Sequence, residues 1–211
     1  MPKYAVLSAI IAAALLLPGQ IASASSSPTD QLVKTLQPII SQLHSQAGTV
    51  SIQGKSYTSK KNGFTLTLPT GWVKLTPPAG ILFAAQPADN TSVEWLFAVT
   101  KYKTQKQADT ASHTLLKHPK DYGQLLLTSL QTQFPTATCV LDRAFKKTIG
   151  GYIGGRAVVT CTMEGSTYTF GVFSYVRKLN YYSVTFMAPQ SAYATYSAQV
   201  DSIIKSLKFT K

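Results

Sequence analysis

Two glycine-rich stretches have the composition of loops that bind phosphate. Residues 148–156 read TIGGYIGGR, and residues 48–56 read GTVSIQGKS. A phosphate loop needs a helix after its glycines, because the backbone N–H groups and the helix N-terminus hold the anion together. Strand-like residues follow both stretches, and the second has five residues between its glycines where the nucleotide-binding pattern has four. We therefore interpret TIGGYIGGR as the link of a β-hairpin.

Metal binding and catalysis receive little support from the remaining polar residues. His113 and His118 are flanked by Asp109 and Asp121, but a spacing of five directs two side chains about 140° apart on a helix. Solvated histidines are the expectation, and a weak metal site is the alternative. No G-x-S-x-G motif marks a nucleophile. We predict no cofactor and no catalytic activity, and a hydrolase without a recognisable motif remains an alternative.

The first 24 residues predict export. A basic residue at Lys3 precedes an apolar run over residues 5–17, and Ala22 and Ala24 stand at the positions that a signal peptidase reads. The run is shorter than the roughly 20 residues that span a bilayer. We expect cleavage near Ala24 and a soluble periplasmic or extracellular protein, with an uncleaved anchor as the alternative.

Two cysteines, Cys139 and Cys161, fit the same compartment. In an exported protein the default state of such a pair is a disulfide. Closing a loop of about 22 residues would stabilise the fold by roughly 3 kcal/mol. A reactive thiol is the alternative, but no histidine lies near either cysteine in the sequence.

The chain is strongly basic, with 20 Lys and Arg against 8 Asp and Glu and a net charge of +12. This excess favours anionic partners such as lipid headgroups, acidic proteins or polyanions. The basic residues are scattered, however, and the densest groups are the pairs Lys60-Lys61, Lys146-Lys147 and Arg177-Lys178. We interpret the charge mainly as a contribution to solubility, and nucleic acid is not an expected partner.

Hydrophobic periodicity divides the chain after residue 54. Residues 25–31 are a polar start, and a helical pattern follows with apolar residues at Leu32, Leu36, Ile39, Ile40 and Leu43. Pro38 inside this pattern should kink or restart the helix, and Gly48 ends it. These residues form the helical leader of a 25–54 segment. From residue 55 onwards a single domain is expected.

The pattern of the domain alternates between strands and helices. Strands are predicted at residues 63–72, 81–87, 92–103, Cys139–Ile149, Arg156–Met163, Thr167–Arg177 and Tyr181–Met187. The last four have links too short for parallel crossovers, so they should form an antiparallel meander. Helices are predicted from Asp121 to Pro135 and over Ser191–Leu207, and residues 106–120 are a polar connection, either helical or irregular. The fold class is α+β: an antiparallel sheet of about six to seven strands covered by helices.

Two segments resemble the PsbP-like superfamily, which includes periplasmic DcrB-like proteins. GFTLTLPTGW at residues 63–72 is similar to the first strand of that family, and YYSVTFMAPQSAYATYSAQVDSIIKSLKF looks like its last strand and closing helix. The resemblance covers roughly residues 55–211. It implies an α/β/α sandwich and a binding or assembly role without catalysis, and no functional residue of the family maps onto these positions.

Aromatic residues on the meander suggest where a partner would bind. Tyr168 and Phe170 face one side of a strand, and Phe173 and Tyr175 face the other, so both sides should be covered unless a bulge intervenes. The alternative is an exposed aromatic patch beside basic residues. The predicted partner-contact residues are Tyr152, Arg156, Arg177 and Lys178. We expect a binding module for a protein or cell-envelope component, with a purely electrostatic binder of polyanions or anionic membranes as the alternative.

Overall fold

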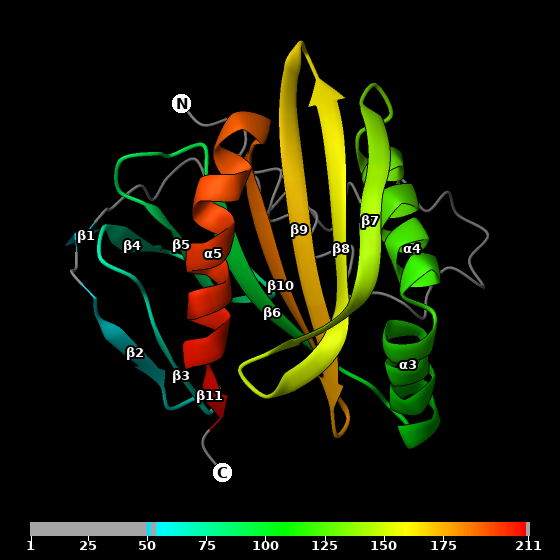
Figure 1. The fold of residues 1–211 in the computed structure, drawn as a ribbon. Helices are drawn as coiled ribbons and strands as arrows, with labels where there is room; N and C mark the ends of the chain where they lie inside the picture. Colours follow the sequence, from blue (N-terminus) through cyan, green and yellow to red (C-terminus); the bar gives the residue numbers. More distant parts are fainter. Residues whose placement is uncertain (1–49, 52–53, 210–211) are drawn as a thin grey trace.

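The computed structural model describes residues 50–51 and 54–209, which form two antiparallel sheets and three helices (Figure 1). The predicted signal peptide and the helical pattern at residues 32–43 lie outside the described residues. Within the described part, no helix has the length and apolarity that a membrane span requires.

An eight-stranded antiparallel sheet forms the centre, in the order β1-β4-β5-β6-β10-β9-β8-β7. Its shorter strands are β1 (Val50–Ser51), β4 (Trp72–Leu75), β5 (Ile81–Pro87) and β6 (Glu94–Lys101). The predicted meander is confirmed as β7 (Thr138–Ile149), β8 (Tyr152–Met163), β9 (Ser166–Arg177) and β10 (Asn180–Pro189). β8 begins earlier than expected, because two glycines alone make the turn before it.

A second sheet has three strands in the order β11-β3-β2. β2 (Ser56–Ser59) and β3 (Phe64–Thr67) form a hairpin, and β11 (Lys208–Phe209) pairs with the outer side of β3. The predicted strand at 63–72 is therefore divided. Its first half is β3 in the small sheet, and after the Pro69-Thr70-Gly71 turn the chain enters the large sheet as β4.

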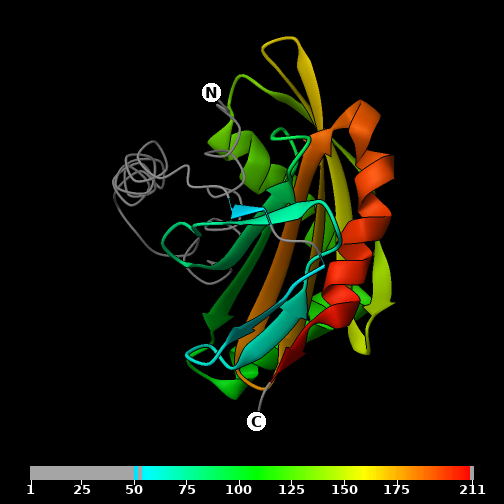
Figure 2. The same ribbon diagram turned by 90° about the vertical axis from the view of Figure 1, so that its left-hand side faces the viewer.

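Helices cover both faces of the large sheet. α5 (Gln190–Ser206) and the small sheet lie on one face, and α3 (Gln105–Lys117) and α4 (Pro119–Gln133) pack on the other face over β7, β8 and β9 (Figures 1 and 2). The polar connection expected at 106–120 is mostly helix α3, which a Thr104–Gln107 capping box begins. α4 starts two residues before Asp121, because Pro119 suits the first turn of a helix.

The aromatic residues of β9 supply both cores. Phe173 and Tyr175 pack in the core under α5, and Tyr168 and Phe170 pack in the core under α3 and α4. β9 pairs with both neighbours without a register shift, so no bulge is needed to explain the change of side. The expectation that both faces are covered is correct for these four residues.

Candidate functional site

The antiparallel topology brings several chain reversals to one end of the molecule. The β2–β3 turn, the β7–β8 turn, the β9–β10 turn, the end of β6, the end of α5 and β11 all lie at the bottom in Figure 1. Register supports this grouping, because Arg177 of β9 and Lys101 of β6 both pair with Asn180 of β10. The backbone N–H of Tyr102 also donates to the carbonyl oxygen of Leu179, at 2.7 Å.

Basic side chains are concentrated at these reversals, and we call this region the basic end. It comprises Lys60, Lys61, Lys101, Lys103, Lys106, Lys146, Lys147, Arg177, Lys178, Lys205 and Lys208. All are exposed except the half-buried Lys147. Among the described residues, the acidic side chains near them are Asp109 on α3 and the ion-paired Asp201, whereas Glu164 lies in the β8–β9 turn at the opposite end. The charge is therefore one-sided.

A stack of aromatic rings packs inside the basic end, beneath its charged surface. The rings of Tyr152, Tyr175 and Tyr182 stack in sequence, with centroids 4.7 and 4.9 Å apart. Phe209 of β11 packs over Tyr182 at 4.7 Å, and the guanidinium of Arg177 lies 5.2 Å from the Phe209 ring centroid. The turn that carries Arg177 is thus held on a packed surface.

The glycines of TIGGYIGGR have two different roles. Gly150 and Gly151 have φ of 58° and 86° and make the two-residue turn between Ile149 and Tyr152, which confirms the hairpin interpretation. Gly154 and Gly155 instead lie inside β8. The pairing of β8 with β9 begins only at Gly155, so the hairpin tip leaves the sheet there and packs against the end of α5 (Figure 1).

Arg156 is buried and has an internal partner. Its side chain is 6% exposed and donates to the carboxylate of Asp201 on α5, and Lys147 of β7 donates to the same carboxylate at 2.7 Å. Half-burial by itself would raise the pKa of Asp201, but the hydrogen bonds and charges of Lys147 and Arg156 outweigh it and lower that pKa. Arg156, which the sequence analysis named as a partner-contact residue, is therefore inside the fold, because its guanidinium pairs with Asp201 under α5.

The other three predicted contact residues differ in how exposed they are. Tyr152 is half-buried, and its hydroxyl donates to the carbonyl oxygen of Leu207 at 2.9 Å. Arg177 and Lys178 are exposed in the β9–β10 turn, where Lys178 has a positive φ of 54°. Of the four predicted contact residues, Arg177 and Lys178 are thus the exposed ones.

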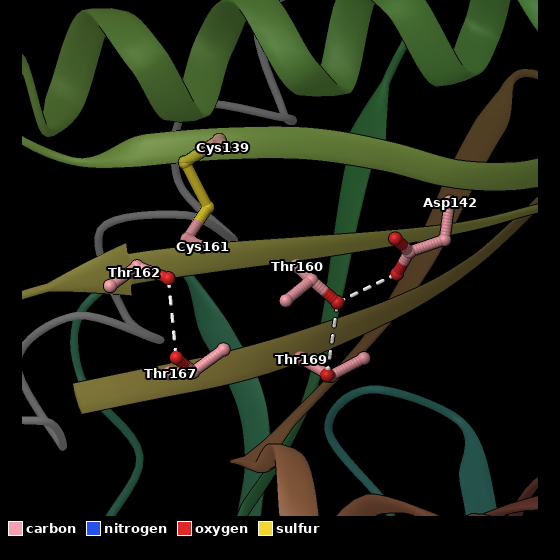
Figure 3. Close-up of a disulfide and its surroundings, with 7 residues drawn as sticks. All are labelled: Cys139, Asp142, Thr160, Cys161, Thr162, Thr167 and Thr169. Carbon is pink, nitrogen blue, oxygen red and sulfur yellow. Dashed lines mark hydrogen bonds between the residues drawn. A yellow bond between two sulfur atoms is a disulfide. The ribbon is translucent and has the colours of Figure 1, made fainter.

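The predicted disulfide between Cys139 and Cys161 is present and joins directly paired residues of β7 and β8 (Figure 3). Beside it, on the other face of the strands, the hydroxyl of Thr160 donates to Asp142, and Thr162 and Thr167 share a hydrogen bond. These bonds crosslink β7, β8 and β9 in the half of the hairpin remote from the basic end.

The two histidines lie close together in space but do not form a metal site. The rings of His113 and His118 are 5.0 Å apart, because the chain breaks between α3 and α4 at His118 and one helix does not contain both. The predicted angular separation of the rings was therefore wrong. Even so, no three His, Cys, Asp or Glu side chains of the described chain gather closely enough to hold a metal ion.

A hollow of about 600 Å³ lies between α4 and β7, away from the basic end. Asp121 and Asp142 both line it, together with Lys120 and Arg143. These two carboxylates are exposed to solvent. Exposure is the ordinary state of surface carboxylates, so the hollow gives the hydrolase alternative no specific support.

Comparison with known proteins identifies the fold. No protein-family model matches the sequence, and no curated protein matches it. A solution structure of cyanobacterial PsbP (CyanoP) from Synechocystis sp. PCC 6803 superposes with a TM-score of 0.55 at 12% identity, over 78% of this chain and 97% of that one. A crystal structure from Bacteroides thetaiotaomicron gives a TM-score of 0.54 at 16% identity, over 76% of this chain.

This chain spans about half the length of the Bacteroides protein, since the match covers 50% of it. At such identities the similarity concerns the fold alone. The protein has a PsbP-like α+β fold, as the two sequence segments suggested.

Sequence reasoning missed the basic end as a surface. The basic pairs Lys60-Lys61 and Arg177-Lys178 are more than 100 residues apart in sequence. Lys146-Lys147 and Arg177-Lys178, however, lie near the β7–β8 and β9–β10 turns, and alternate turns of one antiparallel meander are at the same end. Marking the charge of each predicted turn would have revealed the asymmetry.

Proposed function

We propose that this protein is an exported, non-catalytic binding module whose basic end recognises an anionic protein or cell-envelope component. The observation that carries the proposal is the gathering of basic side chains at one end of the fold. Export is supported by the signal-peptide pattern of residues 1–24 and by the disulfide.

The chemistry of the basic end suits recognition of negative charge. Several exposed ammonium groups and the guanidinium of Arg177 project from turns that are fixed by strand pairing and by the aromatic stack. A one-sided charge orients the protein during its approach to an anionic surface and speeds the encounter. The packed frame beneath then offers a fixed arrangement of charges rather than a flexible basic tail.

A comparison of two charge-reversal variants tests the proposal. The basic-end variant carries Lys60→Glu, Lys103→Glu and Lys178→Glu, and the matched control carries Lys55→Glu, Lys117→Glu and Lys120→Glu. Both change the net charge equally. Binding of each to heparin and to phosphatidylglycerol vesicles is measured in 50 mM NaCl.

We expect the basic-end variant to lose at least about tenfold in affinity and the control less than about threefold, because local charge rather than total charge controls the contact. An equal loss in both variants would show that total charge alone attracts the probes, and the proposed site would be rejected.

A salt titration separates recognition of a specific anionic partner from purely electrostatic binding of polyanions. Affinity that falls steeply between 50 mM and 500 mM NaCl indicates a general polyanion binder, and affinity that survives 500 mM NaCl would show that simple electrostatics does not supply the binding.

A further inference from the structure

One part of the large sheet is apolar although no described helix packs on it. α3 and α4 make their main contacts with β7, β8 and β9, and α5 lies on the other face. On the α3–α4 face, β4, β5 and β6 carry a separate hydrophobic cluster, which we call the β5–β6 patch. It consists of Leu75, Ile81, Ala84, Leu96 and Ala98.

Four of the five patch residues have the burial of a core, and Leu75 is half-buried. Ile81 is 6% exposed, Leu96 is 3% exposed, and Ala84 and Ala98 are 1% and 0% exposed. Flat packing of the strands against one another cannot bury the side chains on an open face. Burial to this degree requires an apolar layer over the patch, and the two alanines would let a helix approach the sheet closely.

The chain itself supplies a segment of the right kind next to the patch. β1 pairs with β4 at the edge of the sheet, with Val50 opposite Lys74, so the residues before β1 reach the sheet beside this patch. Leu32, Leu36, Ile39, Ile40 and Leu43 would form one stripe on a helix, whereas Ser41 and Ser45 would lie on the opposite side.

The length of the segment also agrees with the width of the patch. Helical residues 30–47 would have a summed length of about 27 Å, with a kink or restart at Pro38. The distance across neighbouring strands from β4 to β10 is about 14 Å at about 4.8 Å per step. The segment is therefore long enough to cross the patch obliquely.

We propose that residues 30–47 dock as an amphipathic helix on the β5–β6 patch, beside α3 and α4. The docked segment would complete the helical layer on that face, and the domain would then begin near residue 30 rather than at 55. This inference does not depend on the proposed binding function, since the patch and the basic end involve different residues.

The test uses the chain that begins at Ser25 and two double variants with equal added charge. Leu36→Asp with Ile40→Asp places charges on the apolar stripe, and Ser41→Asp with Ser45→Asp places them on the polar side. We expect the stripe variant to lower Tm by more than about 5 °C and to increase binding of the dye ANS, whereas the control shifts Tm by less than about 2 °C. Equal shifts in both variants would overturn the proposal.

Hydrogen exchange on the unmodified chain gives a second measurement that does not depend on how the variants fold. Docking predicts that amides of residues 32–43 exchange at least about 100-fold more slowly than in an unstructured peptide. Exchange at the unstructured rate would overturn the proposal. Sedimentation of the same chain addresses a second copy as the occupant: a dimer that the stripe substitutions convert to monomer would also overturn it.

Discussion

At the scale of single residues, Asp201 connects three elements. Its carboxylate accepts hydrogen bonds from Arg156 of β8 and Lys147 of β7, and it stands on the inner side of α5. Arg156 is the more deeply buried of the two cations. A buried cation that loses its partner costs more than the ion pair itself contributes, because the charge stays desolvated.

We therefore expect Asp201→Asn to destabilise the fold by about 2–3 kcal/mol at pH 7. Lys147→Met, which removes a more exposed partner, should cost less than about 1 kcal/mol. Urea denaturation of both variants measures these differences. A larger loss from Lys147→Met than from Asp201→Asn would contradict this assignment.

The lowered pKa of Asp201 adds a pH dependence to the same comparison. A carboxylate whose pKa is lower in the folded state stabilises the fold above its unfolded pKa, which is about 3.9 for aspartate. That stabilisation is lost as the pH falls from about 4 through the lowered folded pKa. The difference between wild type and Asp201→Asn should therefore narrow below pH 4.

At the scale of elements, the path of β8 depends on glycine. A Cβ on Gly154 would lie 2.0 Å from the backbone carbonyl oxygen of Ser174 in β9. A backbone atom held in a sheet cannot move aside as a flexible side chain can. Glycine at this position lets the hairpin tip cross closely over β9 and reach α5.

Gly154→Ala should therefore cost at least about 2 kcal/mol, because β8 and β9 must separate to admit the methyl group. Gly165→Ala in the β8–β9 turn is the control: its φ is +76° but its Cβ would meet nothing within 4 Å. That substitution should cost only about 1 kcal/mol of backbone strain. Thermal unfolding of the two variants compares them, and equal losses would show that the close approach is unimportant.

The elements themselves were largely predictable where a periodic pattern was long. The meander and α5 follow from alternation and helical spacing, and the Cys139–Cys161 pair follows from compartment and count. β11 was not predicted, since two residues carry no period. The division of residues 63–72 between two sheets was also missed, because local alternation does not reveal which neighbour a strand pairs with.

At the scale of the whole molecule, charge is distributed unevenly. The candidate site could not be predicted from charge density along the chain, because its members come from three turns (β2–β3, β7–β8 and β9–β10) and two links (β6–α3 and α5–β11). The burial of Arg156, named above as a partner-contact residue, was missed for a related reason. Its partner Asp201 is 45 residues away in sequence, and only the packing of α5 on the sheet brings the two together.

Crowded like charges should make stability depend on salt. At low ionic strength the lysines of the basic end repel one another in the folded state, and added salt screens this repulsion. We expect Tm to rise by about 2–4 °C between 10 mM and 300 mM NaCl. Calorimetry of wild type and of the basic-end variant measures the effect, which should be smaller in the variant. A fall in the Tm of wild type with salt would show that ion pairs outweigh repulsion.

The pairing of β11 with β3 has a consequence for the order in which the protein folds. Phe209 lies opposite Phe64, and Lys208 lies opposite Thr65, so this contact closes a loop of more than 140 residues. Local hairpins such as β7–β8 form early, whereas contacts between distant residues form late. A chain emerging from a ribosome or a translocation channel can therefore build its meander first. The basic end would be assembled last, once Phe209 has emerged to cover Tyr182 and support Arg177.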